Sequence, residues 1–340
     1  MIVTVTLNAA LDVTYAVDGV DWDGVNRVHA VHRRAGGKGV NVARVLAALG
    51  CEIVVAGFAG GVTGTAIETD LATAGLPASL TPIPTESRTT LAISDAPPTS
   101  PRTHPTPPSG VVGRVALFNE AGPEVTSSDL ERFITTFLDL LGAAEAVVLS
   151  GSLPQGVPAD FYATLARYAR ERGVPAIVDA DGDPLRLAPA GRPSILKPNA
   201  HELARALGGP SAPSTSPESL GTSPRLSSFD GQLAGAEALR LAGAESVVVS
   251  MGADGLVAVT PEGSWRARMP YQVNGNPTGA GDALVAGLAL GLVRGTPWPE
   301  RLRTAAALGA AAVATPVAGE IDLEVYRTIS TEIGVEPCPS

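Results

Sequence analysis

The chain has 340 residues, of which 45% are hydrophobic, and a formal net charge of −10. That length and apolar content suffice for one large α/β domain or two smaller ones. The acidic balance argues against a general nucleic-acid binder, which would carry a basic excess, although a local basic cluster would still accommodate a small anionic substrate.

The first elements of the chain are a strand and a glycine-rich turn. Residues 2–7 form a β-branched run that predicts a buried strand. A signal peptide would begin with a basic segment, and none precedes this run, so we do not expect one. Residues 13–34 predict exposed strands and turns. The turn at 36–39 then opens a helix expected over 40–49.

Downstream of this helix, apolar strands alternate with helical segments. We expect strands at 52–58, 146–150, 175–179, 194–197, 246–250 and 255–260, and helices at 63–74, 128–142, 158–172 and from near 201, 280 and 300. This alternation predicts an α/β fold with a doubly wound, mostly parallel sheet flanked by helices.

Two segments interrupt the alternation. Residues 88–93 and 111–118 predict strands on either side of a Pro-rich insert at 96–110, which can form neither a ladder nor a helix. The segments 13–34 and 86–119 are therefore expected to pair as a small β-sheet lid over one edge of the core. The core domain then comprises 1–12, 35–85 and 120–330, and the Ser- and Pro-rich stretch 209–231 is expected to be a flexible surface loop.

Cysteine content and apolar run lengths restrict the compartment. Cys51 and Cys338 are the only cysteines and suggest neither a disulfide framework nor a metal site. The apolar helical runs at 283–293 and 305–314 are too short to span a bilayer. We expect a cytoplasmic protein without membrane or nucleic-acid partners.

A motif of small residues at 276–282, Asn-Pro-Thr-Gly-Ala-Gly-Asp, leads directly into the apolar helix. Its helix start leaves backbone N–H groups unpaired, and such a nest stabilises the negative charge of a transferring phosphoryl group. Asp282 stands beside this nest, where it can accept a proton from an attacking hydroxyl. The alternative is an ordinary first-turn aspartate stabilised by the helix dipole. No Walker-type phosphate loop occurs in the chain.

A second glycine-rich motif, at 35–44, reads Ala-Gly-Gly-Lys-Gly-Val-Asn-Val-Ala-Arg. Asn41 lies one helical turn into it and Asp12 lies upstream, so the two can supply amide and carboxylate partners for sugar hydroxyls. A tight turn before a helix is the simpler alternative. The only two lysines of the chain, Lys38 and Lys197, both lie inside motifs.

Both motifs resemble the two signatures of the phosphofructokinase-B-type (ribokinase-like) sugar kinases. Four other stretches fit the same family in the same order, namely 6–12, 150–154, 197–202 and 250–255. The resemblance covers roughly residues 2–320. It implies a ribokinase-like fold, ATP and Mg²⁺ as cofactors, and a homodimer that forms through the lid.

The resemblance also assigns roles to single residues. The implied catalytic base is Asp282, with the amides of Gly279, Ala280 and Gly281 as the anion hole. The implied sugar contacts are Asp12, Gly37 and Asn41, and the implied nucleotide contacts are Lys197, Asn199, Ser250, Gly252 and Gly255. Glu202 and Asn199 are the implied residues on the Mg²⁺ side. Mg²⁺ keeps much of its hydration, so we expect that pair to act through water. Ser250 as a plain strand end and Glu202 as a solvated helix residue are the alternatives.

The acceptor is expected from the hexose-phosphate branch of the family, which includes 1-phosphofructokinase, tagatose-6-phosphate kinase and the minor 6-phosphofructokinase. Arg88 and Ser152 match the phosphate contacts of that branch, and Arg27 and Lys38 are further cations to test. The alternative for the basic stretch 27–34 is a solvated strand. The chain departs from the branch at Ala9 and Thr90, and carries the Pro-rich insert. Fructose 1-phosphate is the preferred acceptor, with fructose 6-phosphate, tagatose 6-phosphate and free fructose as alternatives.

Two other classes of protein share an α/β fold. A nicotinamide oxidoreductase needs a glycine fingerprint after its first strand, and residues 8–13 contain no glycine. A sensor of sugars or nucleotides on the same fold would be expected to lose the base or the magnesium-side acid. Asp282 and Glu202 are both present, which favours an enzyme.

Overall fold

The computed structural model describes residues 1–94, 115–208 and 228–338, which form two β-sheets and the helices around them. The large sheet consists, in spatial order, of β14 (Gly334–Pro337), β13 (Gly263–Arg268), β12 (Leu256–Thr260), β11 (Ser246–Ser250), β10 (Ile195–Leu196), β9 (Ala176–Asp179), β8 (Ala146–Ser150), β1 (Ile2–Thr6), β4 (Ile53–Gly60) and β5 (Ala78–Ile83). Neighbouring strands run parallel from β5 to β11, and β12, β13 and β14 add an antiparallel edge.

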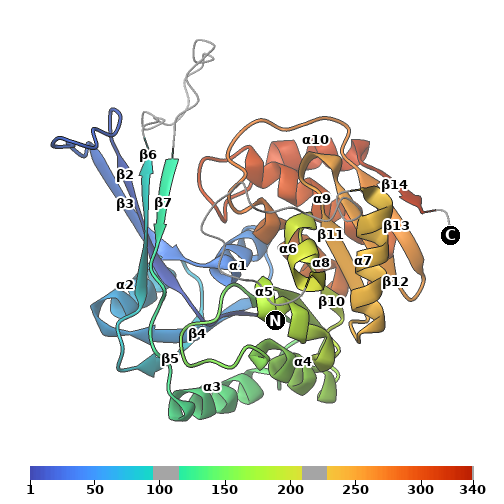
Figure 1. Ribbon diagram of the computed structural model, residues 1–340, viewed down its shortest axis with the longest axis horizontal. Coiled ribbons are helices and arrows are strands. Elements are labelled where there is room, and N and C mark those ends of the chain that lie inside the picture. Colours follow the sequence, from blue (N-terminus) through green and yellow to red (C-terminus); the bar gives the residue numbers. More distant parts are fainter. Residues whose placement is uncertain (95–114, 209–227, 339–340) are drawn as a thin grey trace.

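Helices cover both faces of this sheet (Figure 1). They are α1 (Lys38–Ala48), α2 (Gly61–Thr73), α3 (Ser127–Leu140), α4 (Phe161–Glu171), α5 (Gly182–Leu187), α6 (Ala200–Leu207), α7 (Phe229–Leu241), α8 (Ala280–Arg294), α9 (Trp298–Val313) and α10 (Leu323–Glu332). One hydrophobic core joins the sheet to α1, α2, α8 and α9, and a second joins it to α3, α4, α6 and α7. The predicted doubly wound α/β fold is therefore confirmed.

Strand β1 shows why one sheet serves two cores. Side chains alternate between the two faces of a strand, so Ile2 belongs to one core and Val3 and Val5 belong to the other. All five residues of β1 are buried. A strand covered on both faces reads as the continuous apolar run from which it was predicted.

The small sheet is a separate four-stranded layer with the order β3 (Ala30–Gly36), β2 (Ala10–Ala16), β6 (Arg88–Ser94) and β7 (Val115–Asn119). Strands β2 and β6 run parallel, and the outer pairs are antiparallel. It stands to the left of the large sheet in Figure 1, with its far end directed away from the helices.

Several elements differ from the sequence-based expectation. The helix expected at 40–49 begins at Lys38, and β5, β13, β14, α5, α7 and α10 were not predicted. Most of the expected loop at 209–231 lies outside the described residues, and 229–231 are the first residues of α7. The Pro-rich insert at 96–110 also lies outside the described residues. Gly231 and Gly235 weaken the helical signal of α7, because glycine is a poor helix former.

Candidate active site

The candidate site lies at the carboxyl ends of the central parallel strands, where α/β sheets bind their ligands. Strand β8 ends at Ser150 and β9 at Asp179, and Lys197 follows β10 directly. The N-terminus of α8 opens onto the same edge, because Lys197 Nζ lies within 3.7 Å of the position that a Cβ on Gly281 would take.

The two glycine-rich motifs meet at Asp282. This residue lies in the first turn of α8 and is only 7% exposed. Asn41 Nδ2, from the buried face of α1, donates a hydrogen bond of 2.8 Å to Asp282 Oδ2. Two segments separated by 241 positions are thereby joined through one carboxylate, so the predicted base faces the predicted sugar-binding motif.

The surroundings of Asp282 tune its acidity. Burial, and secondly the negative charge of Asp179, raise the pKa of Asp282 to about 7. The hydrogen bond from Asn41 and the charges of Lys38 and Lys197 lower the pKa and so limit the rise. A carboxylate with a pKa near neutrality is suited to general-base catalysis, because it both exists as the anion and holds a proton strongly.

Asp179 is the hub of a charged cluster. Its Oδ1 lies 3.1 Å from Lys197 Nζ and 3.4 Å from Lys38 Nζ, and its side chain is fully buried. Burial alone lowers the pKa of Lys38, but Asp179, Glu202 and Asp282 outweigh burial and raise the pKa above the ordinary value. Lys38 is therefore a cation at this site. Asp179 was not among the residues predicted for the site, although an acidic residue that ends the buried strand Ala-Ile-Val-Asp indicates one.

Asn199 and Glu202 are joined as the capping box of α6. Asn199 Oδ1 accepts from the Glu202 amide, and the Asn199 amide donates to Glu202 Oε2, both at 2.8 Å. Glu202 Oε1 faces Lys38 Nζ at 3.7 Å, and Asp179 Oδ2 is buried without a hydrogen-bond partner among the described residues. These carboxylate oxygens suit a hard cation such as Mg²⁺. Within the described residues, no three His, Cys, Asp or Glu side chains converge as a metal cage.

The predicted nucleotide residues lie beside this box. Ser250 ends β11, forms a parallel bridge with Asn199, and donates its amide to the Pro198 carbonyl at 3.1 Å. Gly255 follows with a φ of 92°, and a Cβ there would lie 2.1 Å from the Ala267 carbonyl oxygen. Gly252, with a φ of 60°, starts the short 3₁₀ turn between them. The strand–turn is thereby held against the start of α6.

The start of α8 is shaped by glycine. Gly279 takes a φ of 86°, and a Cβ there would lie 2.9 Å from Ala318. The Ala280 amide donates to the Pro277 carbonyl at 3.2 Å, so this member of the predicted anion hole is engaged in the turn. Among the described residues, the amides of Gly279, Gly281 and Asp282 donate no hydrogen bond. These three N–H groups are available to a phosphoryl oxygen.

Asp12 lies in the small sheet, in register with Arg34 on β3 and Thr90 on β6. Burial raises the pKa of Asp12, while Arg34 and then Arg88 oppose the rise. A Cβ on Gly36 would lie 1.9 Å from Asp12 Oδ2, so glycine leaves room for this carboxylate. Gly37 has a φ of 109° and lies against Thr6 at the start of α1.

Arg88 and Ser152 are connected through Asn8. Arg88 Nε donates to the Asn8 carbonyl at 3.1 Å, and Asn8 Nδ2 donates to Ser152 Oγ at 3.0 Å. The two residues predicted to hold a phosphate are thus linked through one buried asparagine, and the charge of Arg88 acts on Asp12. Arg27 lies elsewhere: it is exposed in the connection between β2 and β3, and the described chain shows no contact between it and these residues. Its role stays a prediction.

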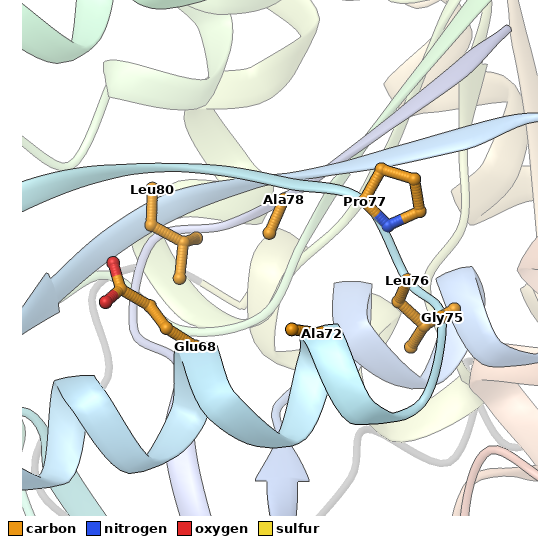
Figure 2. Close-up of a pocket in the computed structure, with 7 residues that line it drawn as sticks. All are labelled: Glu68, Ala72, Gly75, Leu76, Pro77, Ala78 and Leu80. Carbon is orange, nitrogen blue, oxygen red and sulfur yellow. The ribbon is translucent and has the colours of Figure 1, made fainter.

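Two surface hollows lie away from this cluster. One, of about 460 Å³, lies between α2 and β5, where Glu68 and Leu80 face each other (Figure 2). The other, of about 550 Å³, lies between α2 and the small sheet and includes Leu11 and Arg33. Neither is lined by a predicted site residue, and the buried charges converge at Asp282 instead.

In the part of the chain that the structure describes, no helix has the length and apolarity to cross a membrane.

Known structures resemble the whole chain. A possible 1-phosphofructokinase from Thermotoga maritima is 27% identical, with a TM-score of 0.81 and complete coverage of both chains. Phosphofructokinase-2 from Escherichia coli in complex with fructose-6-phosphate is 26% identical, with a TM-score of 0.79 and coverage of 97% of this chain and 98% of that one. The same enzyme has a tetrameric inhibited form. Ribokinase from Arabidopsis thaliana, 19% identical with a TM-score of 0.69 and coverage of 97% and 98%, shares the fold.

A family model matches nearly all of the described chain. The model for the pfkB family carbohydrate kinases matches residues 5–102 and 113–324, which include both glycine-rich motifs. The resemblance expected from those motifs is therefore confirmed. With Asp282 and Asn41 in contact at the edge of the sheet, the chain belongs to the pfkB family of carbohydrate kinases.

Proposed function

We propose that this protein transfers the γ-phosphoryl group of ATP to a hydroxyl of a hexose or hexose phosphate. The observation that carries the proposal is the contact between Asp282 and Asn41, which joins the base to the sugar-binding motif. Family membership supports a carbohydrate acceptor, and the phosphofructokinases among the similar structures support a sugar phosphate.

The reaction follows from the arrangement of the buried charges. The Asp282 carboxylate removes the proton of the acceptor hydroxyl, and the oxygen then forms a bond to the γ-phosphorus. The bond from that phosphorus to the bridging oxygen breaks, and ADP leaves with the bond's electron pair. The amides of Gly279, Gly281 and Asp282 and the side chain of Lys197 stabilise the charge on the transferring group.

The carboxylates beside the lysines fit a divalent cation that accompanies the nucleotide. Asp179 Oδ2, which lacks a hydrogen-bond partner among the described residues, and Glu202 would hold Mg²⁺, with water completing its shell. When bound, Mg²⁺ supplies neutralisation of phosphate charge. Asn199 would act by fixing Glu202 rather than as a ligand through its side-chain oxygen, which the capping box already uses.

Fructose 1-phosphate, converted to fructose 1,6-bisphosphate, is the acceptor that we propose first. The similarity to the Thermotoga maritima protein supports it, as does the pairing of Arg88 and Ser152 through Asn8. Fructose 6-phosphate is the named ligand of the Escherichia coli structure, and it stays an alternative together with tagatose 6-phosphate and free fructose.

We also propose that the small sheet is a lid over the acceptor. Its strands β2 and β6 carry Asp12 and Arg88, so one of its faces forms part of the site. Excluding water from that face would suppress hydrolysis of ATP. A second copy of the chain is the partner proposed for the opposite, apolar face.

An ADP-release assay with the four acceptors tests the function. Asp282→Asn should lower kcat by about a thousandfold, the range expected for loss of a general base, and keep ATP binding. The matched control is Asp139→Asn, which changes an exposed aspartate on α3 and should leave kcat unchanged. Near-normal turnover in Asp282→Asn would remove this residue from the mechanism. Absence of turnover with every acceptor would contradict the proposed function.

A further inference from the structure

The connection between α9 and α10, residues 314–322, touches both halves of the site. Its Ala318 packs so tightly on Gly279 that a Cβ on this glycine would lie 2.9 Å from Ala318 Cα. A Cβ on Gly319 would lie 3.0 Å from Asn41 Oδ1. This connection, which we name the 314–322 loop, therefore abuts the start of α8 and the amide that holds Asp282.

Arg34 joins the small sheet to this loop. It lies on β3, and its Nη2 donates a hydrogen bond of 2.7 Å to the Ala318 carbonyl. Its Nη1 lies 3.6 Å from Glu320 Oε1 on the same loop. The guanidinium is 21% exposed, whereas the Glu320 carboxylate is 55% exposed, so the bond to the carbonyl is the stronger link.

The register of the small sheet places Arg34 beside Asp12. The two residues are direct partners in the β2–β3 pairing, so their side chains lie on the same face. Arg33, the preceding residue, lies on the other face and lines the hollow against α2. The chain thus carries two adjacent arginines of which only one reaches the 314–322 loop.

We infer that Arg34 is a positioning residue that fixes the acceptor strand β2 against the start of α8. The inference rests on the proposed function, since it assumes that Asp12 holds the acceptor. Through Arg34 and Ala318, the distance from Asp12 to Gly279 is set by packed contacts in addition to the chain connections between the two sheets. Transfer requires the acceptor oxygen and the γ-phosphorus at near-contact distance, so a loose connection lowers the reaction rate.

Arg34 also affects the charge of Asp12. Burial raises the pKa of Asp12, and the groups that oppose it are Arg34 and Arg88, the Thr90 hydroxyl and Arg44. Loss of Arg34 raises the pKa of Asp12 further, and a neutral carboxyl accepts fewer hydrogen bonds from a sugar. A lysine at position 34 keeps the charge and loses the planar fork that reaches both loop residues.

The experiment compares Arg34→Gln with Arg33→Gln, which removes the same charge from the other face of β3. In Arg34→Gln the KM for the acceptor should rise about tenfold or more, as expected for a lost charged hydrogen bond. The KM for ATP should stay within about twofold, because the nucleotide contacts are untouched. The amount of ADP formed per phosphorylated sugar should rise above one. Arg33→Gln should match the wild type in each quantity.

Amide hydrogen exchange supplies a readout that needs no acceptor. Peptides covering residues 30–36 and 314–322 should both exchange faster in Arg34→Gln than in Arg33→Gln. Equal exchange in the two variants together with an equal acceptor KM would overturn the inference. If Arg34→Gln does not fold, Arg34→Lys takes its place, and a wild-type KM in that variant would also overturn it.

Two controls separate this inference from the proposed function. Molar mass is measured for each variant first, so that a change of assembly is not mistaken for a change in the site. Wild-type protein without sugar-phosphorylating activity would refute the proposed function, and the exchange rates would still decide whether Arg34 couples the small sheet to the 314–322 loop.

Discussion

At the scale of single residues, the site is controlled by burial of charge. Asp282 is buried beside Asp179, and both conditions disfavour its anion, so the proton is held up to a pH of about 7. Lys38 and Lys197 lie close enough to moderate the effect without abolishing it. The proposed base is therefore half protonated near neutral pH, so small changes in its surroundings change its charge.

A pH profile should show this poise. Because Asp282 must be unprotonated to act, kcat/KM should fall about tenfold per pH unit below a pH of about 7. Asn41→Ala removes a hydrogen bond that lowers the pKa, so the acid limb should move to higher pH. Kinetics between pH 5 and about 9 measure the limb. A limb that stays in place in Asn41→Ala would mean that the bond does not favour the carboxylate.

At the scale of elements, α8 is a largely buried helix whose first turn contains Asp282. Its residues from Asp282 to Gly291 are buried, and it packs closely on α9. A Cβ on Gly287 would lie 2.6 Å from Ala305 Cα, which is backbone and cannot yield easily. Glycine at this position permits the approach that keeps the start of α8 near Lys197.

Gly287→Ala should therefore destabilise the protein although alanine favours helices. Separation of α8 and α9 costs about 1–3 kcal/mol, the usual range for overpacking, against a gain of about 1 kcal/mol in helix propensity. Gly235→Ala in α7 is the matched control, because the atoms nearest to its new Cβ are side-chain atoms of Leu203 and Leu207 at 3.0 Å or more, rather than backbone. Denaturant unfolding measures both. A Gly287→Ala variant as stable as Gly235→Ala would show that the helices separate freely.

At the scale of the whole molecule, the faces of the small sheet differ in their central strands. The register places Asp12, Arg34 and Thr90 on one face, which also carries Val115 and Leu117 of the edge strand β7. The opposite face carries apolar side chains from all four strands, and two of them, Val31 and Phe118, are 42% and 48% exposed in the single chain. Such an apolar face on a polar protein is typical of an interface. A second copy of the chain is favoured as the partner, because one symmetric contact then covers this face on both copies.

Light scattering should find a mass of twice 34.4 kDa or a higher even multiple. Every copy of the chain has the same exposed apolar face, so the copies should associate in pairs. Val31→Asp places a charge in that contact and should shift the mass toward that of one chain. Leu241→Asp alters another exposed apolar residue, 74% exposed at the end of α7, and should leave the mass unchanged. A single-chain mass for the wild type would contradict the interface.

The order of strands and helices followed from the sequence because periodicity is local. Buried runs such as 2–7 and 146–150 and the glycine-rich motifs keep their signal whatever they pack against. The sequence pattern does not predict elements whose local signals are weak. Strand β5 contains Pro82, β14 is short, and α7 contains two glycines. Tertiary packing stabilises them where their intrinsic propensity does not.

By itself the sequence determined the α/β alternation, the kinase family, and the candidate residues Asp282, Asn41 and Asp12, because each sits in a short motif. Only the tertiary structure decided which of them touch. The links from Asp179 to both lysines and from Arg34 to Ala318 join residues that are far apart in the chain. Such contacts depend on how helices and sheets pack, which no local pattern encodes.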